Sequence, residues 1–220
     1  MGLTFGTFGI DQADLNEIVQ TDGFNETLEN GSIDTTNKWT ETLVGTGASS
    51  VTNQLLLTTG ATINSQIKLT LNQPQLLRSS YFRDNNLGFS KYAFEITLNV
   101  TGDSDIDHTK AFIGLATTST SDRSSNDIIG FGFKSDGTLQ VVWDAAGVEI
   151  VEDIGLINTI ENFKIVFDAT GFKFYNKRVL LKSIVDTSST IYANIIINLE
   201  NKNASTSIFK ITNIKGYYIR

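Results

Sequence analysis

The chain has 220 residues, with 24 acidic and 17 basic side chains and a net charge of −7 at pH 7. Nucleic acid and anionic membrane surfaces repel a protein of this charge, so neither is expected as a partner. The absence of cysteine excludes disulfides, thiolate metal sites and thiol nucleophiles. No apolar run approaches the roughly 20 residues of a membrane-spanning helix, and the N-terminus lacks the basic start of a secretory signal.

Residues 1–22 differ in pattern from the rest and predict an N-terminal arm with at most one short helix. Its apolar side chains would each cost roughly 1.5 to 3 kcal/mol to leave in water. We therefore expect Phe5, Phe8, Leu15 and Ile18 to contact a partner in an assembly. The alternative is that this segment supplies a first strand and a connector to the same domain.

From Trp39 onward, short runs of alternating apolar and polar residues are separated by the residues that build turns. This period of two predicts half-buried strands, and so many of them predict an all-β, antiparallel two-sheet jelly-roll sandwich over residues 23–220. The expected strands are 39–44, 54–59, 63–71, 91–100, 110–116, 127–134, 138–144, 148–151, 162–168, 172–175, 179–185, 191–199 and 207–219.

Strand parity sorts these residues into two faces. The alternation assigns Leu139, Val141 and Trp143 to the core, and we expect Trp39 there as well rather than as a sugar platform. The opposite face of the same strand begins with Gln140.

The outward residues of the later strands suit either plain solvent exposure or a ligand. Tyr175 and Tyr192 are candidate platforms for a sugar ring. Asn194 shares the outward face of 191–199 with Tyr192, so these residues and Gln140 are the candidate ligand-binding set. Gly130 and Gly132 open a shallow place where a ligand could approach, although close sheet packing explains them equally well.

The chain resembles the concanavalin A-like lectin and glucanase sandwiches, which include laminin G-like domains. The segment DGFNETLENGSIDTTNKWT carries the resemblance through Phe24, Asn25, Ile33, Asp34 and Trp39. Further similarity lies in FGFKSDGTLQVVWD, in FKIVFDATGFKFYNKRVLL, and in ITNIKGYYIR, a closing strand expected to return beside the first. The Asn-Lys after Tyr175 replaces the usual Asp-Gly or Asn-Gly turn, so we expect a wider hairpin there.

Glycosidases of this group place acids at alternate positions of one central strand, because hydrolysis needs a nucleophile and a proton donor about 5 Å apart. The chain has no such array, so we expect no enzymatic activity. The nearest run is Asp103, Asp105 and Asp107, which falls between two strands. Oxygen ligands at alternate positions can converge on one ion, so this run is a candidate calcium site. A solvated hairpin loop is the alternative, and no other cofactor is expected.

These features favour a non-enzymatic structural protein of a phage particle: a capsid decoration, a fibre or a tail-associated module at the virion surface. Its expected partners are other virion or assembly proteins, further copies of itself in a homo-oligomer, and host or environmental glycans. Many copies would multiply weak sugar contacts into useful attachment. The alternative is a free, secreted carbohydrate-binding module or lectin with an extracellular location.

Overall fold

The structure is a computed structural model of the chain and describes residues 20–26, 33–72, 75–78, 91–101, 109–116, 128–145, 148–157, 161–185 and 191–219. Phe5, Phe8, Leu15 and Ile18 of the predicted arm lie outside these ranges. The described residues form strands and turns, and among them no helix is long and apolar enough to cross a membrane.

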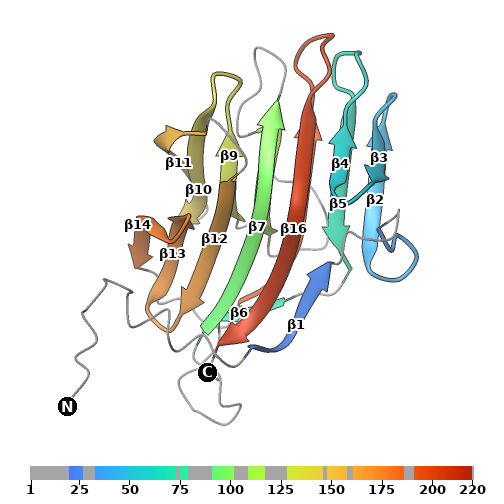
Figure 1. Cartoon of the computed structure of the whole chain (residues 1–220). Helices are drawn as coiled ribbons and strands as arrows, with labels where there is room; N and C mark the ends of the chain where they lie inside the picture. Colours follow the sequence, from blue (N-terminus) through green and yellow to red (C-terminus); the bar gives the residue numbers. More distant parts are fainter. Residues whose placement is uncertain are drawn as a thin grey trace, which may run out of the picture.

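The described fold consists of sixteen strands (Figure 1). They are β1 (Gln20–Glu26), β2 (Trp39–Val44), β3 (Ala48–Val51), β4 (Leu55–Thr58), β5 (Gln66–Leu71), β6 (Gln75–Arg78), β7 (Lys91–Thr101), β8 (Ala111–Ala116), β9 (Ile128–Phe133), β10 (Thr138–Ala145), β11 (Val148–Leu156), β12 (Glu161–Asp168), β13 (Gly171–Asn176), β14 (Val179–Val185), β15 (Ile191–Glu200) and β16 (Ile208–Ile219).

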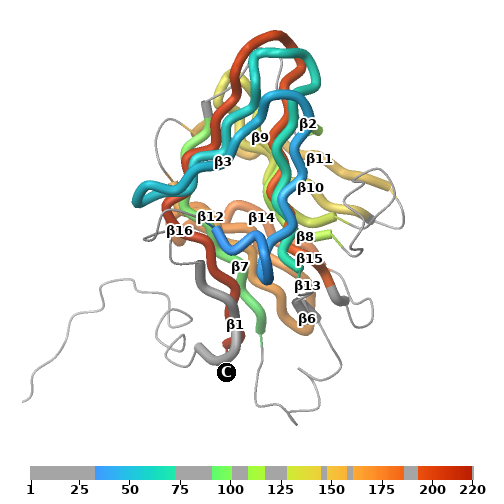
Figure 2. The backbone as a smooth tube through the Cα atoms, turned by 90° about the vertical axis from the view of Figure 1, so that its right-hand side faces the viewer, coloured from blue at the N-terminus to red at the C-terminus, as the bar shows by residue number. Residues whose placement is uncertain are grey.

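The strands build two antiparallel sheets that face one another (Figure 2). Sheet A has the order β14-β13-β12-β7-β16-β4-β3, and β1 also pairs with β16. Sheet B has the order β11-β10-β9-β8-β15-β5-β2, and β6 also pairs with β15. This arrangement confirms the predicted all-β jelly-roll sandwich.

The closing strand returns beside the first, as the sequence resemblance implies. β1 pairs antiparallel with β16, from Gln20 opposite Ile219 to Glu26 opposite Ile214. The last residues of the predicted arm, 20–22, therefore lie in a strand of sheet A.

The core lies between the sheets and follows the predicted period of two. Phe131 of sheet B stands between two rings of sheet A, with centroid distances of 5.1 Å to Phe163 and 5.2 Å to Phe174. Such tilted and edge-on ring pairs are the arrangements that aromatic quadrupoles favour. Trp39 and Trp143 are both buried in this core, as predicted.

The hairpin between β13 and β14 is tighter than expected. Asn176 pairs directly with Val179, so only two residues form the turn. Both of them, Lys177 and Arg178, have positive φ angles of 48° and 71°, which is the geometry of a two-residue hairpin turn that glycine or asparagine normally fills. Glu161 supports the turn by accepting a hydrogen bond from Lys177 Nζ at 3.1 Å. Because only two residues form the turn, the prediction of a wider hairpin is wrong.

Candidate functional site

The face of sheet B that points away from sheet A, here called the outer face, is unusually closed for one side of a sandwich. Its centre is an apolar cluster separate from the core, made of Phe112, Ala116, Ile128, Val142 and Ile196. Polar residues flank this cluster and are themselves buried: Gln140, Asn194, Asn198, Lys68 and Thr70. The sequence left two interpretations of the outward residues open, solvent exposure or a ligand. Because these five residues are buried, solvent exposure is excluded for them.

Phe112 fills the space over Gly130, one of the two glycines that were expected to open a shallow place. A Cβ on Gly130 would stand 2.5 Å from Phe112 Cζ and 2.5 Å from the carbonyl oxygen of Ile113. A Cβ on Gly114 would meet the same ring carbon at 2.7 Å. The two glycines face each other across β8 and β9, so they serve close packing of one ring on the sheet rather than an open ligand space.

Gln140 is held in a fixed orientation on this face by Asp153. Gln140 Nε2 donates to Asp153 Oδ1 at 2.6 Å, and Lys134 Nζ contacts the other carboxylate oxygen at 2.8 Å. Rotating the amide would bring its oxygen against the carboxylate, so the assignment of the two amide atoms is chemically settled. Gln140 Oε1 is left buried with no hydrogen-bond partner.

Asn194 presents a second acceptor of the same kind. Its Oδ1 is buried and also has no hydrogen-bond partner. The register pairs connect Gln140 on β10 through Gly132 and Phe112 to Asn198 on β15. Asn194 lies four residues away from Asn198 on the same strand. Strand spacing and rise place the two amides about 20 Å apart, so one small ligand would not reach both.

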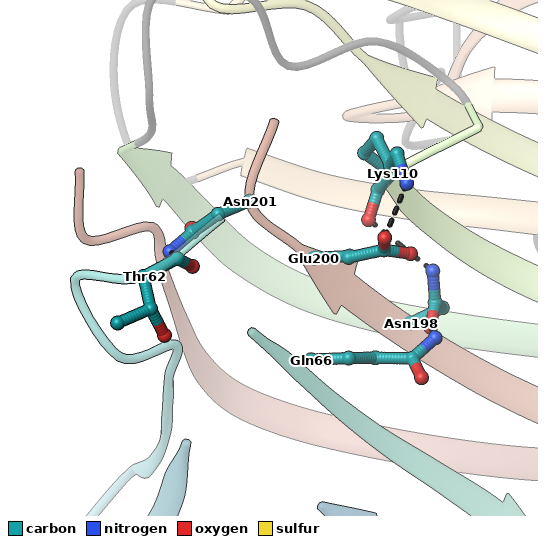
Figure 3. Close-up of polar contacts among 6 residues, drawn as sticks. All are labelled: Thr62, Gln66, Lys110, Asn198, Glu200 and Asn201. Atoms are coloured by element: carbon teal, nitrogen blue, oxygen red, sulfur yellow. Dashed lines mark hydrogen bonds and ion pairs between the residues drawn. The ribbon is translucent and has the colours of Figure 1, made fainter. Parts of the chain in front are cut away.

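A bonded polar network closes the other end of the outer face (Figure 3). Gln66 Nε2 donates to Asn198 Oδ1 at 2.7 Å, and Asn198 Nδ2 donates to the backbone carbonyl of Lys110 at 3.2 Å. Lys110 forms an ion pair with Glu200, and Asn201 Nδ2 donates to the carbonyls of Gly60 and Thr62. Gln66, Asn198, Lys110 and Glu200 are connected to one another, and Asn201 separately bonds the loop at Gly60 and Thr62. The acceptors of this end therefore have partners, unlike Gln140 Oε1 and Asn194 Oδ1.

Asp144 and Glu149 form a carboxylate pair across β10 and β11. Their Cα atoms are direct antiparallel partners, on the same outer face as Gln140. Directly opposed residues have Cβ atoms about 4.5 to 5.5 Å apart. Within the described strands no other register pair joins two acids. Side chains of Asp and Glu that start this close can bring their carboxyl groups to the separation of about 5 to 5.5 Å that retaining glycosidases use.

The structure brings only part of the predicted ligand-binding set together. Gln140 and Asn194 share the outer face of sheet B, whereas Tyr175 lies in β13 of sheet A. Lys164 Nζ lies 5.5 Å from the centroid of the Tyr175 ring, so a cation already occupies one approach to it. Tyr192 pairs through its backbone with Leu76 of β6, and its side chain is outside the described part of the structure.

The predicted calcium ligands Asp103, Asp105 and Asp107 lie outside the described residues. Among the residues that are described, no group of three or more acids and histidines stands close enough to hold a metal ion. The calcium site therefore stays a prediction.

Sequence reasoning missed Asp153 and the Asp144–Glu149 pair, because each depends on which strand lies beside which. The expected strand 148–151 was also too short to include Asp153, and β11 in fact continues to Leu156. The clue was present in the sequence, since VVWDAAGVEIVED reads as a hairpin that brings acids on two strands together.

Comparison with family models gives no match, and neither does comparison with the sequences of curated proteins. Solved structures do match over nearly the whole chain. A Bacillus licheniformis β-glucanase has a TM-score of 0.64 at 14% identity, covering 91% of this chain and 99% of that one. The catalytic domain of an endo-1,3-β-glucanase (laminarinase) from Thermotoga petrophila RKU-1 has a TM-score of 0.65 at 11% identity, covering 92% and 99%.

A third match is a Mycobacterium tuberculosis protein described as an immunostimulatory antigen and pseudo β-1,3-glucanase. Its TM-score is 0.66 at 9% identity, covering 90% of this chain and 98% of that one. At these identities the matches establish the fold, which is the concanavalin A-like jelly roll of the glucanase type.

The expectation of a non-enzymatic virion structural protein is contradicted by these matches, because two of the matching structures are named as a β-glucanase and an endo-1,3-β-glucanase. The expectation that the chain is no enzyme fails with it. That expectation was based on a search for acids along single strands. Such a search does not detect acids that are paired across two strands, as Asp144 and Glu149 are. The resemblance to the concanavalin A-like group is supported, whereas its phage context has no support here.

Proposed function

We propose that this protein is a carbohydrate-active protein that takes a β-glucan chain on the outer face of sheet B and hydrolyses it. The observation that carries the proposal is the pair of buried, unpartnered acceptors, Gln140 Oε1 and Asn194 Oδ1, on a sheet of the glucanase fold. Leaving a buried acceptor without a donor costs about 1 to 3 kcal/mol. Sugar hydroxyl groups are donors that would recover this cost.

The spacing of these acceptors favours a polymer over a small sugar. They stand about 20 Å apart by strand geometry, so a ligand that satisfies both is an extended oligosaccharide. Both atoms are buried, and binding therefore requires the face to open and admit the glycan.

Asp144 and Glu149 are the proposed hydrolytic pair, one as nucleophile and the other as proton donor. They lie toward the β10–β11 edge of the same face, and Glu149 is exposed. A glycan laid across the face could thus reach both the amides and the carboxylates. Glycans are the proposed partner. The proposed location is extracellular, because β-glucans are polymers found outside cells.

The test measures binding and cleavage separately on laminarin and lichenan, with the α-glucan dextran as the control polymer. Affinity electrophoresis reports binding, and release of reducing ends reports cleavage. We expect Gln140→Ala and Asn194→Ala to weaken binding by about tenfold each, the equivalent of about 1.4 kcal/mol. Tyr175→Ala, on the opposite sheet, is the control for this site and should leave binding unchanged.

Asp144→Asn and Glu149→Gln should abolish reducing-end release and retain binding. Binding by the wild-type chain without any release would contradict the hydrolytic half of the proposal. Absence of binding to both β-glucans would contradict all of it. A loss of binding in Tyr175→Ala alone would move the site to sheet A.

A further inference from the structure

The two edge strands β11 and β14 lie at the same side of the sandwich and both leave one side unpaired (Figure 1). β11 ends sheet B and β14 ends sheet A, and within the described strands no strand pairs with the outward side of either. An ion pair of 2.6 Å between Lys182 Nζ and Glu152 Oε2 joins them. Unpaired edges of this kind are templates for pairing with another chain.

Both edge strands also expose large apolar side chains. Val148 on β11 is 62% exposed and Val185 on β14 is 82% exposed. Further exposed apolar residues on the same two strands are Ile150, Leu156, Val179 and Leu180. Edge strands that remain free in solution are usually protected by charge, proline or short length. β11 has nine residues, β14 has seven and neither contains proline, so charge is the feature that restricts what can pair with them.

The two edges carry opposite charge. β11 contains Glu149, Glu152 and Asp153 and no basic residue. β14 and the turn before it contain Lys177, Arg178 and Lys182 and no acidic residue. Part of this charge is balanced within one copy, by Lys134 at Asp153, by Glu161 at Lys177 and by the Lys182–Glu152 pair. The remaining sign of each edge favours β11 against β14 over two copies of the same edge.

We propose that a second copy of this chain docks on this side, with β11 of each copy against β14 of the other. A two-fold axis parallel to the strands brings sheet B of each copy into line with sheet A of the other. The two β11–β14 strand pairs are then equivalent by symmetry. Each strand pair is about 23 Å long, the length of β14. The occupant is a second copy because this chain carries both complementary edges on the same side.

The test is sedimentation equilibrium of the full chain over the micromolar range, with paired substitutions of opposite charge at one position. Val185→Glu puts an acid opposite acidic β11 and should weaken the dimer more than tenfold, about 1.4 kcal/mol. Val185→Lys has a comparable loss of apolar surface but faces the opposite charge, so it should stay within about threefold of wild type. On β11 the signs reverse, with Val148→Lys weakening the dimer and Val148→Glu retaining it.

Mixing Val185→Glu with Val148→Lys separates this arrangement from any other pairing of edges. The mixture should form a heterodimer more tightly than either variant forms a homodimer, because one of its two edge contacts is unaltered and the other joins an edge that has gained an acid to an edge that has gained a lysine. Circular dichroism and thermal melting should show all four variants folded, since both positions are exposed. A monomeric wild-type chain across the micromolar range, equal effects of the two charges at Val185, or failure of the mixture to associate would each overturn the proposal.

Discussion

The ring of Phe112 lies across Gly130 on the outer face of sheet B, and its Cζ is 2.5 Å from the point where a Cβ on Gly130 would stand. The ring and the glycine belong to the adjacent strands β8 and β9. Because Gly114 and Gly130 have no side chains and Phe112 covers them, this part of β8 and β9 presents no polar side chain. The polar groups of the face lie on the strands to either side. Gln140 and Asn194 are placed in this way.

We expect Gly130→Ala to destabilise the fold by about 1 to 3 kcal/mol, because the added methyl group meets both the Phe112 ring and the Ile113 carbonyl oxygen. Denaturant unfolding measures the loss. Phe112→Leu in the same chain removes the ring contact but not the backbone contact, so it should recover only part of the stability. Full recovery would show that the ring alone requires the glycine.

Replacing Asn194 by Leu should raise the free energy of unfolding by about 1 kcal/mol while weakening β-glucan binding. The reason is that the buried Oδ1 of Asn194 has no hydrogen-bond partner, so removing the amide relieves a desolvation cost. Asn198→Leu is the matched control on the same strand and face. Asn198 bonds both Gln66 and the Lys110 carbonyl, so its loss should lower stability, and the same sign for both variants would contradict this account.

Tyr92→Phe should stabilise the protein by about 1 kcal/mol in denaturant unfolding. Tyr92 is fully buried in the core, its hydroxyl group has no hydrogen-bond partner, and burial raises the pKa of that hydroxyl well above its usual value. Tyr217→Phe is the control, because the Tyr217 hydroxyl donates to Glu95 Oε2 at 3.2 Å. The control should lose stability; a gain there would mean that removing any tyrosine hydroxyl suffices.

Stability should fall in acid partly through Asp168. Burial favours the neutral form of this carboxyl group, but hydrogen bonds from Thr170 and Lys173 outweigh burial and hold the pKa of Asp168 below its usual value. A depressed pKa in the folded state adds stability that is present above the unfolded pKa of about 3.9 and is lost as the pH falls through the folded pKa.

Asp168→Asn keeps an acceptor for the Thr170 amide but removes the charge. The variant should therefore lose less free energy of unfolding than wild type between about pH 5 and pH 2, as followed by urea unfolding at each pH. Lys173→Gln should reduce the acid sensitivity only in part, because the Thr170 bonds at 2.8 and 2.5 Å remain. Parallel pH curves for wild type and Asp168→Asn would refute the role of Asp168.

The alternation of apolar and polar residues determined the strands, their inward faces and the two-sheet fold. β2 and β14 have the predicted limits, and Leu139 and Val141 are buried in the core as predicted. Alternation acts within one strand, so it can be read locally. Short or weakly alternating strands escaped it, as the unpredicted β3 and β6 demonstrate.

Only the tertiary structure decided which strands are neighbours, and the candidate site depends on that order. It placed Gln140 of β10 and Asn194 of β15 on one face of sheet B, with β9 and β8 between their strands, and it placed Tyr175 on the opposite sheet. The face of each residue follows from its own strand, but the partner across the ladder is set by how all the strands bury their apolar faces together. Sequence therefore determined the layers of this protein, whereas long-range packing decided the site.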